Sequence, residues 1–195
     1  MDETWDDYAN DWDENPDVIK YSELAYKSLI DFLDISNKKV LDFGCGTGLL
    51  TGKIAKNASS VLAIDTSSKM LEILKNKDIR NVTTLHRELS KEAVEEHTIL
   101  QSEYDIILAS SVCAFIPYFN EVLPLIKSLL KPNGVFIQWD WESTKENPDF
   151  GFDEETIKKL YKEAGLSLIK IDREFTIQTD KGSLNTLMAV GKKED

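Results

Sequence analysis

Asp42-Phe43-Gly44-Cys45-Gly46-Thr47-Gly48 stands between a short apolar run and an amphipathic one. Lys39 to Phe43 has the continuous apolar character of a buried strand, and Thr47 to Lys56 has the spacing of a helix. Glycines at such a junction let the chain turn tightly and let a ligand approach the backbone. In open α/β sheets, ligands bind at the carboxyl ends of strands. The stretch therefore predicts the ligand-binding turn of an α/β fold.

The same order of elements repeats along the chain. Further strands are predicted at Ser60 to Asp65, Asn81 to Leu85, Tyr104 to Ser110, Val135 to Trp139, Leu166 to Thr176 and Ser183 to Gly191. Helices are predicted from Asn15-Pro16 to about Leu33, and then at Ser67 to Lys75, Ser90 to His97 and Asn120 to Leu130. A last helix is capped by Phe152-Asp153-Glu154-Glu155 and runs to about Ala164. Apolar strands that alternate with helices predict a mostly parallel sheet covered on both faces. The last two strands are close enough to pair as an antiparallel hairpin.

The acid at the end of the second strand narrows the kind of ligand. Asp65 is placed to accept hydrogen bonds from two ribose hydroxyls. Dinucleotide sites require G-x-G-x-x-G, so that a pyrophosphate can lie on the helix N-terminus. Here Leu49 stands where the third glycine of that pattern would be. This departure disfavours an NAD-dependent oxidoreductase.

Three motifs resemble those of the class I S-adenosylmethionine-dependent methyltransferases. Val40 to Gly48 resembles the first motif of that family, and Val61 to Asp65, followed by Ser-Ser-Lys-Met-Leu, resembles the second. Leu129 to Gly134 resembles the turn before the family's fifth strand. The resemblance covers roughly residues 38 to 140. It implies a Rossmann-like three-layer α/β sandwich with a seven-stranded, mostly parallel sheet and a C-terminal antiparallel hairpin strand. It also implies methyltransferase activity with S-adenosyl-L-methionine as cofactor.

The resemblance assigns cofactor contacts to the first two strand ends. The backbone of Gly44, Cys45 and Gly46 would pack against the methionine part of the cofactor, and Asp42 would help to hold its amino group. Asp65 would bind the ribose hydroxyls. Met70 and its neighbour Thr66 would lie beside the adenine.

Three more contacts are implied further along the chain. Glu88 stands where the family usually has Asp, and it would accept a hydrogen bond from the adenine amino group while Leu89 covers the ring. Ser110, at the end of the fourth strand, would border the methionine end.

Several of these residues have a purely structural alternative. Asp42 could cap the turn that follows it, and Asp65 could cap the helix beginning at Ser67. Glu88 could be a solvated acid at a helix start, and Met70 could belong to the core. Cys45 is disfavoured as a nucleophile because the family places a small packing residue there.

Methyl transfer from a sulfonium needs position, a dry cavity and, for a protonated acceptor, a base. Asp140, after the fifth strand, is the candidate base or anchor for a cationic acceptor, with Trp139 or Trp141 as a wall. The alternative is a surface acid next to core aromatics. The two histidines, His86 and His97, are disfavoured as the base. Ala109 to Cys113 lacks the Asn- or Asp-Pro-Pro-aromatic motif by which relatives methylate exocyclic amines of bases and glutamine amides.

An aromatic and acidic segment precedes the first helix. Trp5, Tyr8 and Trp12 recur at i, i+3 and i+7, one face of a helix, amid the acids Asp2, Glu3, Asp6, Asp7, Asp11, Asp13 and Glu14. The segment is either an arm packed on the domain or a lid, and the two are compatible. By resemblance Tyr8 and Trp12 would contact the cofactor as parts of a lid. Tyr8, near the sulfonium, is also a candidate for the catalytic step.

Composition limits the partners. The net charge of −12 disfavours nucleic acid and anionic membranes, and no apolar run approaches the roughly 20 residues of a membrane span. The first residues lack the pattern of a signal peptide, and two cysteines form no disulfide framework, so a cytoplasmic location is expected. We expect one domain over 1–195, with an arm at 1–35 and a core at 36–195. The expected methyl acceptor is a small molecule, and no metal site is expected in the protein. A protein methyltransferase and a non-catalytic cofactor-binding partner subunit are the alternatives.

Overall fold

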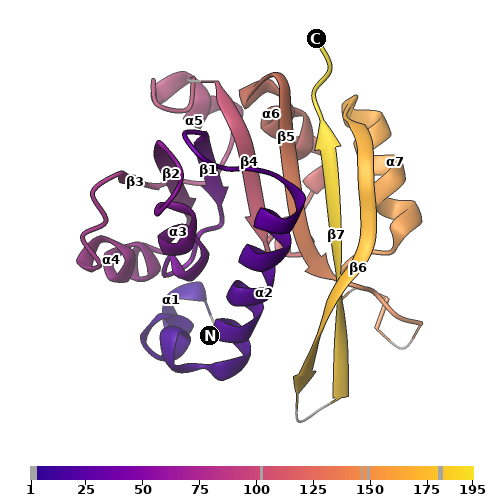
Figure 1. The fold of residues 1–195 in the computed structure, drawn as a ribbon, viewed down its shortest axis with the longest axis horizontal. Helices are drawn as coiled ribbons and strands as arrows, with labels where there is room; N and C mark the ends of the chain where they lie inside the picture. The colour runs from indigo at the N-terminus through magenta and orange to yellow at the C-terminus, as the bar shows by residue number, and fades with distance from the viewer. Residues whose placement is uncertain (1–3, 102, 146, 149, 180–181) are drawn as a thin grey trace. The chain divides into compact units, whose positions relative to one another are not determined.

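The computed structural model describes residues 4–101, 103–145, 147–148, 150–179 and 182–195 (Figure 1). Asp2 and Glu3, two of the acids that surround the N-terminal aromatic residues in the sequence, lie outside the described residues. The chain forms two compact parts, Met1–Glu88 and Leu89–Asp195. That the chain is a single domain stays a prediction.

The first part holds three parallel strands in the order β3-β2-β1. These are β1 (Lys39–Phe43), β2 (Ser60–Asp65) and β3 (Val82–His86). The first two begin and end at the predicted residues, and β3 lies one residue later than predicted. Phe43 pairs with Ile64, and Asp65 pairs with His86. The strands therefore end side by side, which brings their terminal residues to one edge of this sheet.

Helices precede and connect these strands. They are α1 (Trp5–Tyr8), the 3₁₀ helix η1 (Ala9–Glu14), α2 (Pro16–Phe32), α3 (Leu49–Ile54) and α4 (Ser68–Asn76). The predicted start of α2 is confirmed, because the side chain of Asn15 accepts a hydrogen bond from the Asp17 amide with Pro16 in the first turn.

The aromatic segment is not one continuous helix as its spacing predicts. A single α-turn passes into the 3₁₀ helix, in which three residues rather than 3.6 complete a turn. The rings nevertheless gather, since the centroid of Trp5 lies 6.1 Å from that of Tyr8 and 6.2 Å from that of Trp12. Trp5 and Tyr8 stay 41% and 44% exposed.

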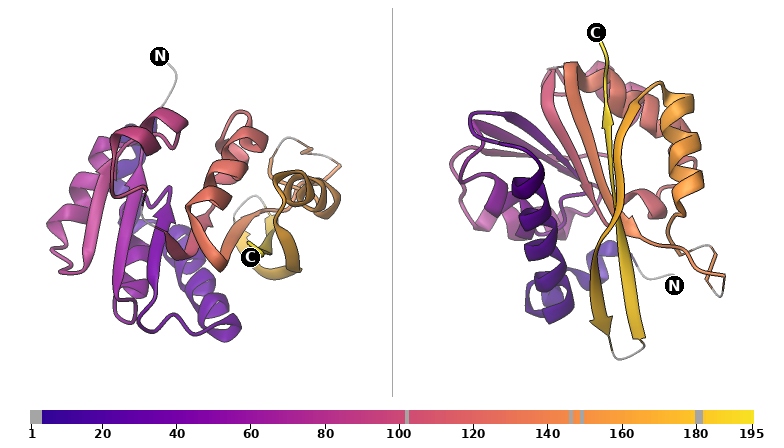
Figure 2. Two further views of the ribbon diagram at one scale, coloured as in Figure 1. Left: turned by 90° about the horizontal axis from the view of Figure 1, so that it is seen from above. Right: turned by 45° about the vertical axis from the view of Figure 1, so that its right-hand side comes forward.

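The second part holds four strands in the order β4-β5-β7-β6. Its elements are α5 (Lys91–Glu96), β4 (Tyr104–Ser110), the 3₁₀ helix η2 (Cys113–Phe115), α6 (Phe119–Leu129), β5 (Leu130–Trp141), α7 (Glu154–Ala164), β6 (Ser167–Thr179) and β7 (Gly182–Lys192). β4 and β5 are parallel, and β7 is antiparallel to both β5 and β6. The predicted C-terminal hairpin is confirmed, and it twists along its length (Figure 2).

The predicted turn before β5 lies inside the strand. Leu130 pairs with Tyr104 and the next pair is Ile106 with Val135, so four residues bulge from the ladder. A Cβ on Gly134 would lie 2.9 Å from the carbonyl oxygen of Lys131, which explains the glycine. The prediction that β5 begins at Val135 is wrong, because β5 pairs with β4 both before and after this turn.

Candidate functional site

The glycine turn, residues 42–48, leaves β1 in left-handed backbone conformations. Gly44, Gly46 and Gly48 have φ angles of 69°, 54° and 82°, a region that residues with a Cβ enter only with strain. The amides of Gly44 and Cys45 both donate to the carbonyl of Ile64, at 2.8 and 3.1 Å. The end of β2 thus fixes the start of the turn.

Two of these glycines lie against neighbouring side chains, and at Gly48 the packing leaves no room for a Cβ. A Cβ on Gly48 would lie 2.3 Å from Cδ1 of Leu74, so the turn packs directly on α4. A Cβ on Gly46 would meet Nε1 of Trp12 at 3.6 Å and Sδ of Met70 at 4.0 Å. One face of the turn is therefore lined by the arm and by α4.

Asp65 supports both the turn and the following helix. Its Oδ2 accepts from the Gly46 amide at 2.8 Å, and its Oδ1 accepts from the Ser67 amide at 2.8 Å. Ser67 in turn caps α4 by accepting from the Met70 amide. Asp65 therefore does not itself cap α4, the structural alternative given above, but it holds the amide of Ser67, the residue that does. Each carboxylate oxygen has a second lone pair that can accept a further hydrogen bond.

Asp42 is buried beneath the turn. Its Oδ2 accepts from Oγ1 of Thr51 at 2.5 Å. Burial raises the pKa of Asp42 to about 6, since removal from water disfavours the charged form, and the nearby Asp65 acts in the same direction. Asp42 does not cap the turn through a described backbone contact. A cation beside it would find an incompletely compensated carboxylate.

The other predicted contacts of the first part differ in exposure. Cys45 packs in a cluster with Ala63 and Leu74, and burial raises the pKa of its thiol well above the usual range, which disfavours a nucleophilic thiolate. Met70 is buried, whereas Thr66 and Glu88 are exposed.

Two predicted cofactor contacts belong to the second part. Leu89 is buried, and Ser110, which ends β4, is half-buried.

The arm, residues 4–14, is fixed to the turn and to α4 by acids that sequence reasoning did not single out. Asp13 accepts from the hydroxyl of Thr47 inside the turn and pairs with Nζ of Lys77 at 2.7 Å. Asp6 accepts from Oγ of Ser67 at 2.5 Å. The acids of the arm signal it in the sequence, but nothing in their spacing identifies these partners.

Asp140, the candidate base, is fully buried in the second part. Its Oδ1 accepts from the Ala114 amide at 3.2 Å, and its Oδ2 accepts from Nε2 of Gln138 at 3.0 Å. Oε1 of Gln138 accepts from the hydroxyl of Tyr161. Burial raises the pKa of Asp140 to about 7, and the thiol of Cys113 lies against it. The alternative of a surface acid is excluded by this burial.

The segment that Asp140 contacts is strained and carries exposed aromatics. Ser111 and Tyr118 both have positive φ, 57° and 58°, which costs on the order of 1 kcal/mol for each residue with a Cβ. The Ser111 amide donates to the carbonyl of Trp139 at 2.7 Å. Tyr118 is 75% exposed and Phe115 is 45% exposed. Such strain in a segment after a parallel strand points to a functional constraint.

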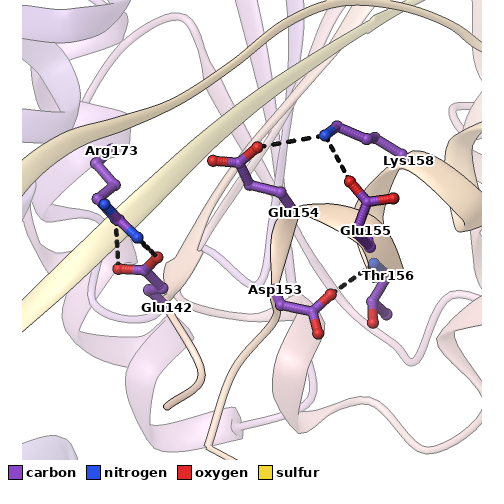
Figure 3. Close-up of polar contacts among 7 residues, drawn as sticks. All are labelled: Glu142, Asp153, Glu154, Glu155, Thr156, Lys158 and Arg173. Atoms are coloured by element: carbon purple, nitrogen blue, oxygen red, sulfur yellow. Dashed lines mark hydrogen bonds and ion pairs between the residues drawn. The ribbon is translucent and has the colours of Figure 1, made fainter. Parts of the chain in front are cut away.

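Glu142, two residues after Asp140, is bound to the hairpin. Its carboxylate accepts from Nε of Arg173 at 2.7 Å (Figure 3). It also accepts from Nδ2 of Asn185 at 2.9 Å. The start of α7 is capped nearby by Asp153, which accepts from the Thr156 amide, as the sequence predicts. These contacts fix the two ends of the segment that joins β5 to α7.

Among the residues that the structure describes, no three His, Cys, Asp or Glu side chains gather as metal ligands. Within the same residues, no helix is both long and apolar enough to cross a bilayer.

A comparison with protein families identifies the kind of domain that the chain contains. Residues 41–136, from inside β1 to inside β5, match a family model described as a methyltransferase domain. The stretch 41–136 belongs to the methyltransferase domain family. The chain is 36% identical over 103 residues to the ubiquinone biosynthesis O-methyltransferase of Haemophilus ducreyi, covering 50% of the chain and 43% of that relative. The chain therefore spans less than half the length of this relative.

Solved structures confirm the predicted fold class. A putative methyltransferase of Haloferax volcanii, solved in complex with a methyltransferase activator, matches with a TM-score of 0.80, 15% identity and full coverage of both chains. The N-methyltransferase NodS of Bradyrhizobium japonicum, solved with S-adenosyl-L-homocysteine, matches with a TM-score of 0.68 and 17% identity, covering 94% of this chain and 90% of that one. At such identities the likeness shows the fold.

Proposed function

We propose that the chain transfers a methyl group from S-adenosyl-L-methionine to a small-molecule acceptor. The observation that carries this proposal is the glycine turn with a carboxylate on each side. Three glycines in left-handed conformations expose the backbone, Asp42 lies buried at the end of β1, and Asp65 ends β2. The H. ducreyi relative is named for O-methyl transfer, and NodS was solved with the demethylated cofactor.

The residues of the turn fit the chemistry of this cofactor. S-adenosylmethionine carries an ammonium, a sulfonium and two ribose hydroxyls. The buried carboxylate of Asp42 would gain from a nearby ammonium, because its raised pKa records a charge without enough compensation. Asp65 retains acceptor capacity for hydroxyls while its present bonds hold it in place.

The proposed cofactor set combines this geometry with the family resemblance. It comprises Asp42, Gly44, Cys45, Gly46, Asp65, Thr66, Met70, Glu88, Leu89, Ser110, Tyr8 and Trp12. When bound, the cofactor supplies an activated methyl group for in-line displacement. The protein orients it through the carboxylates, and the arm excludes water from the turn.

We propose that Asp140 acts through the segment after β4 rather than as the base. Both of its oxygens are engaged inside the protein, one of them by the Ala114 amide of η2. A base must reach the proton that it removes. The same segment presents Phe115 and Tyr118, which we propose as walls for an apolar or aromatic acceptor.

The location and the acceptor class are proposals of the same kind. A cytoplasmic location is supported by two cysteines that are free and buried. A small-molecule acceptor is supported by the name of the H. ducreyi relative.

Calorimetric titration tests the cofactor, and a screen tests the acceptor. S-adenosylhomocysteine should bind with micromolar or better affinity, whereas NAD should give no heat. Incubation with methyl-labelled cofactor against quinol, phenol, amine and peptide acceptors should then label a small molecule. Label on peptides alone would favour a protein methyltransferase, and cofactor binding without any transfer would favour a non-catalytic subunit.

A further inference from the structure

Two carboxylates of the arm dock it on the first part. Asp6 lies at the start of α4, where it accepts from Oγ of Ser67 at 2.5 Å and from the Lys69 amide at 3.3 Å. Hydrogen bonds from Ser67 and the Lys69 amide lower the pKa of Asp6, so docking favours its charged form. Seven residues later, Asp13 makes the second attachment.

The attachment through Asp13 reaches into the glycine turn itself. Its Oδ1 accepts from the hydroxyl of Thr47, which is fully buried between Gly46 and Gly48. Its Oδ2 lies 2.7 Å from Nζ of Lys77, the residue after α4. One carboxylate therefore connects the arm both to the glycine turn and to the end of α4.

The neighbour of Asp13 covers the turn. Nε1 of Trp12 lies 3.6 Å from the position that a Cβ on Gly46 would occupy, so the indole faces the glycine turn across a space of about one methyl group. Because Trp12 and Asp13 are adjacent, the bond to Thr47 restrains where the indole can lie. Holding a short arm in one position costs conformational entropy, and the two bonds of Asp13 offset that cost.

We propose that Asp13 is a positioning residue that holds Trp12 over the glycine turn and thereby slows release of the bound cofactor. The positioning of Trp12 by Asp13 does not depend on the proposed function, whereas the slower release of cofactor rests on it. The closed arm and the bound cofactor stabilise each other, and release requires the Asp13 carboxylate to leave Thr47. Lid openings of this kind commonly limit ligand release.

The first experiment uses the protein without any ligand. Hydrogen exchange of residues 4–14 is compared among wild type, Asp13→Ala, Thr47→Val and Thr47→Ser, with Glu14→Ala as a control that removes the same charge from an exposed site. In Asp13→Ala and Thr47→Val, the amides of residues 4–14 should exchange about tenfold faster than in wild type, as expected for loss of one hydrogen bond to a charged group. Thr47→Ser and Glu14→Ala should stay within about twofold of wild type. Equal exchange in Asp13→Ala and Glu14→Ala would overturn the attachment.

The second experiment measures release of S-adenosylhomocysteine by stopped flow. Asp13→Ala should raise the dissociation rate about tenfold with little change in the association rate, while Lys77→Met gives a smaller increase. A merely structural role would lower the melting temperature without this kinetic asymmetry. Tighter binding in Asp13→Ala would contradict the proposal, because the arm would then compete with the cofactor. If wild type bound no S-adenosylhomocysteine, the proposed function would fail, and the exchange result would still decide the attachment.

Discussion

Asp42 and Asp140 lie near the carboxyl ends of strands, whereas Asp6 and Asp13 lie on the arm. Burial raises the pKa values of the first pair, to about 6 and about 7. Hydrogen bonds lower the pKa of Asp6. The strand-end acids are therefore held in the fold at a cost to stability at neutral pH, while the arm acid gains from docking. Groups that weaken a fold in their working state are often retained for a binding or catalytic role.

The largest effect that this contrast predicts is on the pH dependence of the unfolding free energy of Asp140→Asn. A carboxyl with a pKa near 7 in the native state and 3.8 in the unfolded state binds protons more tightly when folded. Its contribution to stability is thus present at low pH and lost as the pH rises from about 4 to about 7, amounting to about 4 kcal/mol. Urea unfolding at pH 4 and pH 8 should show a loss of stability in Asp140→Asn that is about 4 kcal/mol smaller than in wild type, because Asp42 still contributes to the loss in both proteins. Parallel profiles for the two proteins would contradict the assignment.

Asp42→Asn should change the pH dependence of the unfolding free energy in the same direction as Asp140→Asn, but by a smaller amount. The pKa of about 6 against 3.8 predicts a loss of about 3 kcal/mol between about pH 4 and pH 6 in wild type. Saturating S-adenosylhomocysteine should shrink this loss, because its ammonium stabilises the charged carboxylate. Thermal unfolding with and without ligand across this pH range measures both effects. A ligand that leaves the slope unchanged would separate Asp42 from the amino group.

Glu142 provides an intermediate case. Its bonds to Arg173 and Asn185 lower its pKa, so its contribution is present above the unfolded pKa and is lost as the pH falls. Arg173 is largely exposed, and we therefore expect Glu142→Gln to lower the unfolding free energy by only about 1 kcal/mol. Lys158→Met, which removes the more exposed pairs with Glu154 and Glu155 (Figure 3), serves as the matched comparison and should cost less.

Asp6→Asn should give the smallest change in global stability. Because the lowered pKa belongs to a half-buried group on the short arm, urea unfolding of the variant should match that of wild type. Exchange of the arm should instead become faster, and acidification of wild type below about pH 4 should produce the same acceleration. An arm whose exchange ignores both changes would show that Asp6 does not dock it.

The glycine turn could be predicted because its causes are local. Gly44, Gly46 and Gly48 are required by backbone conformation, and the apolar runs before and after them define the strand and the helix. Asp65 follows from its place at the end of β2. Its present bonds to Gly46 and Ser67 are structural, and its binding of ribose hydroxyls stays a proposal.

The rest depends on contacts between distant residues. Asp13 and Thr47 are 34 positions apart, and no spacing rule connects them. The burial of Asp140 depends on Gln138 and on Tyr161 of α7, so its place after a strand could indicate an acid but not its surroundings. The bulge in β5 likewise arises from pairing with β4 on both sides of a turn.

The central claim is that the glycine turn and its two acids bind S-adenosylmethionine. Calorimetry of S-adenosylhomocysteine with wild type and Asp65→Ala tests it directly, with Glu72→Ala on the exposed side of α4 as control. Loss of hydrogen bonds from two ribose hydroxyls to a carboxylate predicts an affinity about 100-fold weaker in Asp65→Ala, with the control unchanged. Equal affinity in all three proteins, or no binding by wild type, would contradict the claim.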